Sequence, residues 1–291
     1  MTDVGVAVVG VGRMGGAMAA RLRGTGLNVV AYNRTPARAA GLASRFGVGM
    51  ATTAREAAAA GEVVLVSLAD DEAVRRTYAG ADGLAAGLRP GAVVVETSTI
   101  DPDTVRALSP IVESRGATLL DAPVSGSVPL VERGELTFMV GGPAEALERV
   151  RPVLDVLARQ VFHVGARGTG SVVKLATNLV IHGLNQALSE ALVLAERAGV
   201  PRATAYEVFA ASAVAAPFVH YKRPAFEHPE ETPVAFTLDL VAKDLDLIER
   251  LGERVGAELR QTHANAEVVR AAIAAGLGDH DMSALARFLS Q

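Results

Sequence analysis

The stretch Val6-Ala-Val-Val-Gly10-Val-Gly12-Arg-Met-Gly15 decides the fold of the first half of the chain. A short apolar run leads into three glycines spaced G-x-G-x-x-G, and a helical stretch ending near Leu22 follows. In this arrangement Gly10 permits a tight turn, Gly12 lets the backbone approach a pyrophosphate and Gly15 lets the helix pack closely on the strand. The helix N-terminus faces the phosphate charge. Because strand, glycines and helix occur in the required order, the stretch predicts a dinucleotide site.

Short apolar runs continue to alternate with helical stretches up to about residue 165. These runs are residues 4–9, 28–32, 63–66, 92–95, 117–120, 137–140 and 161–164. Most are rich in valine and apolar on both faces, as parallel strands are when helices cover the sheet on each side. The alternation predicts an α/β Rossmann-type, doubly wound domain over residues 1–165.

After Gly170 the pattern changes, because no strand-like run recurs. A helical pattern runs from about residue 171 to residue 197 and stops at Gly199-Val-Pro201. A helix of this length suits a connection between two domains. Further helical stretches cover residues 201–211, 237–255, 264–275 and 281–289. We therefore predict an all-α domain over residues 166–291, joined to the first domain by a long helix, for substrate binding and dimerisation.

Composition excludes several classes of function. The net charge of −4 provides no basic patch for nucleic acid. The chain has no cysteine, which excludes disulfides, zinc–thiolate sites and thiol nucleophiles. No apolar run has membrane-spanning length, and residues 1–3 lead directly into the first strand, so we expect a cytoplasmic protein without a signal peptide or membrane contact.

The end of the second strand bears on the choice of cofactor. An NAD site favours a carboxylate there, about 20 residues after the glycines, but this chain reads Asn33-Arg34-Thr35. Arg34 can stack on adenine and pair with a 2′-phosphate, and Asn33 and Thr35 can donate hydrogen bonds. The sequence therefore favours NADP(H), while NAD(H) stays possible if Arg34 only stacks on the base.

Other strand ends are expected to touch the cofactor, because ligands bind outside the carboxyl ends of parallel strands. The candidate segments are Ser67-Leu68-Ala69-Asp70 and Thr97-Ser98-Thr99, which follow the runs 63–66 and 92–95. Either segment can instead serve as a helix cap, and Asp70, Asp101 and Asp103 are read first as caps. The cofactor-binding residues expected in the first half of the chain are Gly10, Gly12, Arg13, Met14, Gly15, Asn33, Arg34, Thr35, Ser67, Leu68, Ala69, Ser98 and Thr99.

Lysine is scarce, since only three of the 28 Lys and Arg residues are lysines. Arg cannot give up a proton at neutral pH, whereas a partly buried Lys can, so Lys174 is the first candidate for proton transfer. Asn178 lies four residues further on and so shares its helix face. The turn Ser125-Gly126-Ser127 exposes backbone N–H groups that suit a carboxylate. Each feature alone is also consistent with a solvated surface.

These segments together resemble the β-hydroxyacid dehydrogenase family, which includes 3-hydroxyisobutyrate dehydrogenases and glyoxylate/succinic semialdehyde reductases. The matching segments begin at Gly10, Asp121 (Asp-Ala-Pro-Val-Ser-Gly), Gly168 (Gly-Thr-Gly-Ser-Val-Val-Lys-Leu-Ala-Thr-Asn), Phe236 (Phe-Thr-Leu-Asp-Leu-Val-Ala-Lys-Asp-Leu) and Gly278. The resemblance spans nearly the whole length in the right order. Where the family often has Ser-Gly-Gly, this chain has Ser-Gly-Ser, a variant that resembles the semialdehyde reductases.

The resemblance implies catalytic roles for Lys174, as the general acid or base, and for Asn178. It implies substrate contacts for the Ser125–Ser127 backbone, and it places Phe236 and Lys243 close to the nicotinamide. His182, two turns beyond Lys174, is a further candidate for substrate contact, although a helix histidine more often packs in the core. No metal-ligand spacing is found among the histidines or carboxylates, and Lys222 is expected at the surface.

The leading hypothesis is an NADP(H)-dependent oxidoreductase that interconverts a small aldehyde or keto acid and its hydroxyacid. An imine reductase on the same scaffold is the alternative; those enzymes generally carry another residue where Lys174 stands. A non-catalytic NADP-binding scaffold is a remote third reading, since it leaves Lys174 and Asn178 without a purpose. The Ala- and Leu-rich helical half predicts a homodimer, with a tetramer possible. The segment over residues 211–228 matches no family pattern and leaves the substrate open.

Overall fold

The computed structural model describes residues 4–291, and it divides the chain into two compact units, Met1–Lys174 and Leu175–Gln291. The dividing point falls inside one long helix, α9 (Thr169–Arg197). A domain boundary after residue 165 stays a prediction. The expectation of a chain without a signal peptide rests partly on residues 1–3, which lie outside the described residues. Over residues 4–291, no helix combines the length and the apolar character needed to cross a membrane.

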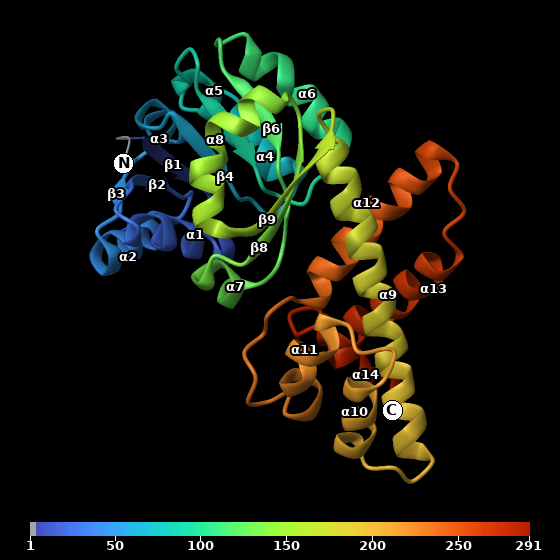
Figure 1. Cartoon of the computed structure of the whole chain (residues 1–291). Helices are drawn as coiled ribbons and strands as arrows, with labels where there is room; N and C mark the ends of the chain where they lie inside the picture. The colour runs from blue at the N-terminus through green and yellow to red at the C-terminus, as the bar shows by residue number, and fades with distance from the viewer. Residues whose placement is uncertain (1–3) are drawn as a thin grey trace. The chain divides into compact units, whose positions relative to one another are not determined.

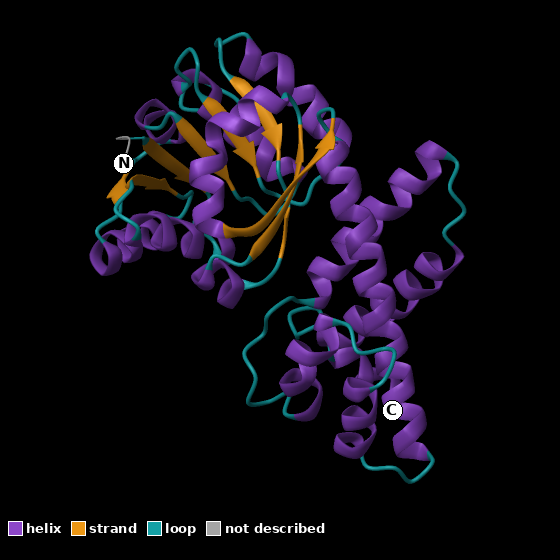
Figure 2. Cartoon of the chain, in the orientation of Figure 1, coloured by secondary structure: helices purple, strands orange, loops and turns teal. Residues whose placement is uncertain are grey.

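A nine-stranded sheet forms the centre of the first unit (Figures 1 and 2). Its strand order is β3-β2-β1-β4-β5-β6-β8-β7, and β9 pairs with β8. The strands are β1 (Gly5–Val9), β2 (Asn28–Tyr32), β3 (Gly49–Met50), β4 (Val63–Val66), β5 (Val93–Glu96), β6 (Thr118–Asp121), β7 (Val124–Ser125), β8 (Leu136–Gly141) and β9 (Ala158–Gly165). The order reverses direction at β1 and β4, where a doubly wound sheet opens its ligand crevice.

Helices cover both faces of the sheet, which explains the valine runs. Helices α1 (Arg13–Gly24), α2 (Pro36–Phe46), α7 (Val128–Arg133) and α8 (Ala144–Leu157) share one apolar core with the sheet. Helices α3 (Ala54–Ala60), α4 (Asp71–Tyr78), α5 (Leu84–Gly87) and α6 (Pro102–Glu113) share the other. Successive residues of β4, Val64 and Leu65, enter opposite cores, so this strand has no polar face. The predicted doubly wound domain is confirmed.

The far edge of the sheet departs from the expected parallel arrangement. Strand β8 pairs antiparallel with β6 through Asp121 and Gly141, and β7 pairs antiparallel with β8. The two-residue strands β3 and β7 are too short to show a periodic pattern, and the sequence did not predict them.

The second unit is built from helices (Figure 2). After α9 come α10 (Arg202–Ala211), α11 (Pro217–Glu227), α12 (Leu238–Val255), α13 (Arg260–Ala272), the π-helical turn η1 (Ile273–Leu277) and α14 (Ala284–Leu289). One apolar core joins them, with Leu192, Tyr206 and Val269 fully enclosed. The predicted helical domain is confirmed, and α11 occupies the segment for which the sequence offered no assignment.

Candidate functional site

The glycine loop between β1 and α1 has the backbone geometry that a dinucleotide requires. Gly10 has φ +91°, and a Cβ there would lie 2.3 Å from the carbonyl oxygen of Ser67. A Cβ on Gly15 would lie 2.1 Å from the carbonyl oxygen of Gly10, so this position cannot carry a side chain without moving the loop. Helix α1 therefore packs against the turn as closely as the glycine spacing predicted.

Gly12 differs from its neighbours because open space lies where its side chain would stand. The nearest atom to a Cβ at Gly12 is Nη1 of Arg38, 4.0 Å away. Gly12, Arg13 and Arg38 line one end of a surface hollow of about 670 Å³ that continues along α1 to Arg21 and is bordered by α2 and α7. Open space over a helix N-terminus, bordered by guanidinium groups, fits a pyrophosphate and a further phosphate. The residues present thus fit a phosphorylated dinucleotide on their own geometry.

Asn33 ties the second strand to the glycine loop. Its Oδ1 accepts a hydrogen bond from the backbone N–H of Val11 (3.1 Å), and its Nδ2 donates to the carbonyl of Thr35 (3.1 Å). The amide thus shapes the loop through backbone contacts, whereas Arg34, Thr35 and Arg38 are exposed. The sequence singled out Arg34 and Thr35 but missed Arg38. A basic residue four positions after Arg34, in the first turn of the next helix, is the signal that was available.

The loops after β4 and β5 meet at the same edge of the sheet. The backbone N–H of Leu68 donates to Oγ of Ser98 (2.8 Å), which joins two segments expected at the cofactor. Met14 is half-buried on α1, and Ala69 and Thr99 follow their strands in the same two loops.

Asp70 caps α4 by accepting from the N–H of Ala73 (2.7 Å), as read from the sequence. Asp101 caps α6 through the N–H of Asp103 (2.9 Å), whereas Asp103 itself pairs with Arg106.

Asp121 anchors the helix that carries Lys174. Its carboxylate is fully buried and accepts from the N–H groups of Gly168 (2.8 Å) and Ser171 (2.9 Å), at the first turn of α9. Burial raises the pKa of Asp121, and these backbone hydrogen bonds oppose that rise. The helix N-terminus also favours the carboxylate charge. Lys174 is half-buried in the second turn of α9, so its backbone is fixed against the end of β6.

The Ser125-Gly126-Ser127 turn begins in β7 and leads into α7. Gly126 has φ +138°, and a Cβ there would lie 2.6 Å from Cδ2 of Leu136. Only glycine fits that conformation and that approach. Ser125 and Ser127 are half-buried, and Gly126 is exposed.

In the second unit, one buried carboxylate gathers three candidate residues. Asp244 is 1% exposed, and its Oδ2 accepts from Nδ2 of Asn178 (2.6 Å). Nε2 of His182 lies 3.5 Å from the same oxygen, and Nζ of Lys243 lies 3.0 Å from Oδ1. Asn178 and His182 come from α9, and Lys243 comes from α12. The structure thus joins Asn178 to Asp244, 66 positions further along the chain, an aspartate for which the sequence predicted no role.

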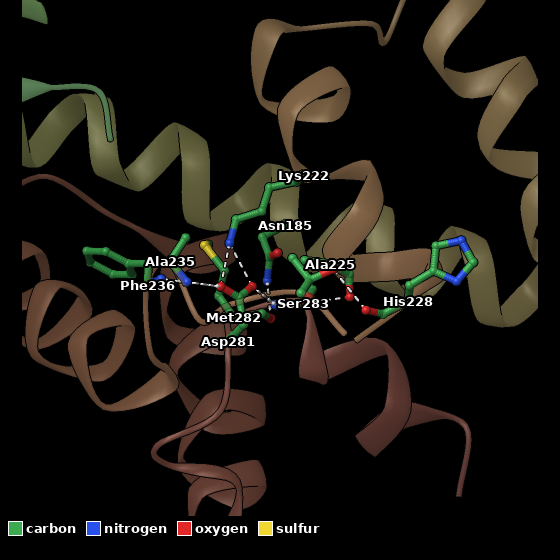
Figure 3. Close-up of polar contacts among 10 residues, drawn as sticks. Asn185, Lys222, Ala225, His228, Ala235, Phe236, Asp281, Met282 and Ser283 are labelled. Carbon is green, nitrogen blue, oxygen red and sulfur yellow. Dashed lines mark hydrogen bonds and ion pairs between the residues drawn. The ribbon is translucent and has the colours of Figure 1, made fainter. Parts of the chain in front are cut away.

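Phe236 lies next to this group, with its ring centroid 5.9 Å from that of His182. The Phe236 N–H donates to Oδ2 of Asp281 (3.3 Å), and the Phe236 carbonyl accepts from the N–H of Met282 (2.8 Å) (Figure 3). Asp281 in turn forms a bidentate ion pair with Lys222, with Nζ–O distances of 2.6 and 2.7 Å. Lys222 is 3% exposed, so its expected surface position is wrong. Among the described residues, no group of three or more His, Asp or Glu side chains is placed to hold a metal ion.

Comparison with known proteins covers both halves of the chain. Residues 5–165 match the sequence profile of the NAD binding domain of 6-phosphogluconate dehydrogenase, and residues 168–289 match the profile for NAD-binding of NADP-dependent 3-hydroxyisobutyrate dehydrogenase. A protein of Mycobacterium bovis described as a probable 3-hydroxyisobutyrate dehydrogenase is 35% identical over 96% of both chains. Glyoxylate/succinic semialdehyde reductase 2 of Arabidopsis thaliana is 30% identical over 97% of this chain and 78% of its own.

Solved structures lead to the same group. The 3-hydroxyisobutyrate dehydrogenase of Mycobacterium tuberculosis, solved with L-serine, has a TM-score of 0.87 at 33% identity, with all of both chains covered. An imine reductase from Pseudomonas sp. has a TM-score of 0.66 at 23% identity, over 99% of this chain and all of its own, which shows a shared fold alone. Sequence, fold and glycine loop thus agree, and the chain belongs to the β-hydroxyacid dehydrogenase family as an NAD(P)-dependent hydroxyacid dehydrogenase.

Proposed function

We propose that this enzyme uses NADP(H) to interconvert a small aldehyde or keto acid and its hydroxyacid, with Lys174 as the general acid and base. The anchoring of α9 by Asp121 carries the proposal. Two backbone hydrogen bonds fix the first turn of the helix to a buried carboxylate, one turn before Lys174. Such support holds a catalytic group within the narrow range of positions that proton transfer demands.

The chemistry needs one hydride and one proton. A bound nicotinamide cofactor supplies the hydride to the carbonyl carbon of the substrate. As the carbonyl π-bond breaks, Nζ of Lys174 gives a proton to the developing alkoxide oxygen and becomes neutral; in the oxidative direction Nζ takes that proton back. Half-burial of Lys174 suits both steps, because partial desolvation lowers the cost of a neutral amine.

Asn178 and the Ser125–Ser127 backbone are proposed to hold the substrate. Asn178 lies one turn beyond Lys174 on α9, and its Nδ2 is fixed on Asp244, so the orientation of its amide is set before substrate arrives. Preorganised donors and acceptors of this kind are worth more than mobile ones, since they need not reorient during the reaction. His182 is assigned to the substrate side and Phe236 and Lys243 to the cofactor side.

The preference for NADP(H) is supported by the guanidinium groups near the glycine loop. No carboxylate stands at Asn33-Arg34-Thr35, where an NAD site would bind the ribose hydroxyls. Arg38 adds a second cation to Arg34 and reaches toward Gly12. Two arginines can bind a 2′-phosphate through charge-assisted hydrogen bonds, and NAD(H) has no phosphate at that position.

A substrate panel tests the proposed reaction. Glyoxylate, succinic semialdehyde, methylmalonate semialdehyde and cyclic imines are each assayed with NADPH and with NADH. We expect at least one of the aldehyde acids to oxidise NADPH, and the imines to react much more slowly. Oxidation of NADPH by imines alone would favour imine reduction. Binding of NADPH without turnover of any compound would favour a cofactor-binding scaffold.

A second copy of the chain is the proposed partner, on the evidence of a stripe on α9 in which exposed residues alternate with half-buried ones. The stripe consists of Thr177, Val180, Leu184, Ala187, Ala191 and Leu194. Its spacings alternate between three and four residues, which is the spacing of a coiled-coil seam. Val180 is 65% exposed and Leu194 is 73% exposed, which is unusual for large apolar side chains in line. Sedimentation should show a dimer that Val180→Glu dissociates, whereas Glu253→Lys, at an exposed position of α12, leaves it intact.

A further inference from the structure

Glu96 is a buried carboxyl group at the ligand-binding edge of the sheet. It is the last residue of β5 and is 1% exposed. In register it stands between Val66 of β4 and Asp121 of β6. The preceding residues Val93–Val95 are apolar, so the strand ends in a carboxyl group at the carboxyl edge, where ligands of doubly wound sheets bind. The proposed function gives this side chain no role.

The contacts of Glu96 lead from a helix to both loops of that edge. Its Oε2 accepts from the hydroxyl of Tyr78 on α4 (3.0 Å), and its Oε1 accepts from the backbone N–H of Ser98 (3.0 Å). Oγ of Ser98 then accepts from the N–H of Leu68 (2.8 Å). The carboxyl group therefore fixes the backbone of the loop after β5, and through Ser98 it fixes the loop after β4.

The groups that face Glu96 supply no positive charge. On α4 they are Tyr78 and Asp71, and on β6 the register neighbour is Asp121, whose carboxylate is committed to the backbone of α9. Over residues 4–291, no Lys, Arg or His forms an ion pair with Glu96. Burial raises the pKa of Glu96 to about 7, and the hydrogen bonds from Ser98 and Tyr78 oppose that rise. The side chain therefore changes its charge near neutral pH.

We propose that Glu96 is a positioning residue for the cofactor. Its carboxylate holds the backbone of Ser98, and its protonation loosens the two loops that Ser98 and Leu68 join at the cofactor site. The inference rests on the proposed place of Leu68 and Ser98 in the cofactor site. An ionised carboxylate accepts both hydrogen bonds and strengthens each by its charge. Protonation turns one oxygen into a donor, from which the Tyr78 hydroxyl can accept, and the N–H of Ser98 is left with a neutral carbonyl oxygen, a weaker acceptor than a carboxylate. Cofactor affinity is therefore higher in the ionised form.

The test compares NADPH binding by wild type and Glu96→Gln, followed by nicotinamide fluorescence from about pH 5.5 to about pH 8.5. Glutamine resembles the protonated acid, and this variant should fold because it removes a buried charge. At about pH 5.5 the two affinities should agree within about twofold, and at about pH 8.5 the variant should bind about fivefold more weakly. The ratio of the two affinities cancels any titration of the cofactor phosphate, since both proteins bind the same ligand.

A double-mutant cycle with Ser98→Ala provides the second arm. If Glu96 acts through Ser98, the fivefold effect of Glu96→Gln at high pH should shrink to below about twofold in the Ser98→Ala background. Equal affinities of wild type and Glu96→Gln at both pH values would overturn the inference, and so would a weakening that is the same at both. Failure of the proposed function would look different, because wild type would then fail to bind NADPH or to turn over any aldehyde acid.

Discussion

Replacement of Glu96 by glutamine should stabilise the protein at neutral and alkaline pH. The pKa of this carboxyl rises from an ordinary value of 4.5 to about 7 in the folded protein. A tenfold change in proton affinity is about 1.4 kcal/mol, so the ionised side chain destabilises the native state by about 3 kcal/mol above pH 7. Glutamine avoids this cost but weakens a hydrogen bond worth about 1 kcal/mol. The expected net gain is about 2 kcal/mol.

The sign of the pH dependence follows from the direction of the pKa change. Between 4.5 and about 7 the folded protein holds a proton on Glu96 that the unfolded chain has already lost. The contribution of this group to stability therefore falls as pH rises through that window, and it is constant above it. The Glu96→Gln variant should therefore be about 1 kcal/mol less stable than wild type near pH 4.5, where only the weakened hydrogen bond counts, and its full gain should be reached near pH 8.

Hydrogen exchange under urea is the suitable assay, because peptides from β4 and β5 report on the sheet that holds Glu96. The free energy of opening of these peptides is measured at about pH 5 and about pH 8 in both proteins, after correction for the intrinsic exchange rate. If the variant's free energy of opening, relative to wild type, rises between these two pH values, the result supports the destabilising effect of the buried Glu96 carboxylate. A variant less stable than wild type at pH 8 would refute it, since the carboxylate would then be a net stabilising group.

Three further variants test other parts of the site. Arg38→Ala should weaken NADPH binding about tenfold and NADH binding by less than about twofold, measured by fluorescence titration; equal losses would remove Arg38 from the 2′-phosphate site. Asp121→Asn should lower turnover about tenfold with NADPH affinity unchanged, because α9 loses a charged anchor; a drop in affinity alone would contradict a role through Lys174. Lys222→Met should destabilise the protein by about 3–5 kcal/mol in urea unfolding, because the buried Asp281 loses its cation, and Lys222→Met with Asp281→Asn should recover most of the loss. A neutral effect of Lys222→Met would show that Asp281 is solvated or protonated.

The sequence predicts the elements in which apolar residues follow a clear pattern. Strands β2 and β4 have the predicted ends, because runs rich in valine leave little choice. The antiparallel pairing of β8 could not be predicted, because the direction of a strand depends on the end of the sheet at which the chain re-enters it. Helix α11 has Pro224 inside it and a mixed composition, so it left no clear pattern.

Long-range pairing explains what the sequence analysis missed in the site. Lys222 was expected at the surface because it belongs to no recognised motif, and its partner Asp281 lies 59 residues away. Asp244 was visible only as the neighbour of Lys243, and its bond to Asn178 needs α9 and α12 to pack. Glu96 could have been noticed, since a buried valine strand rarely ends in a carboxyl group without a reason.

Single-turnover and steady-state kinetics of Lys174→Ala and Lys174→Arg test the central claim most directly. With the best aldehyde acid of the panel, both variants should turn over at least about 100-fold more slowly than wild type, while NADPH affinity stays within about threefold. Arginine should fail nearly as badly as alanine, because it keeps the charge but cannot release a proton. Unchanged turnover in either variant would show that the proton comes from elsewhere and would contradict the account.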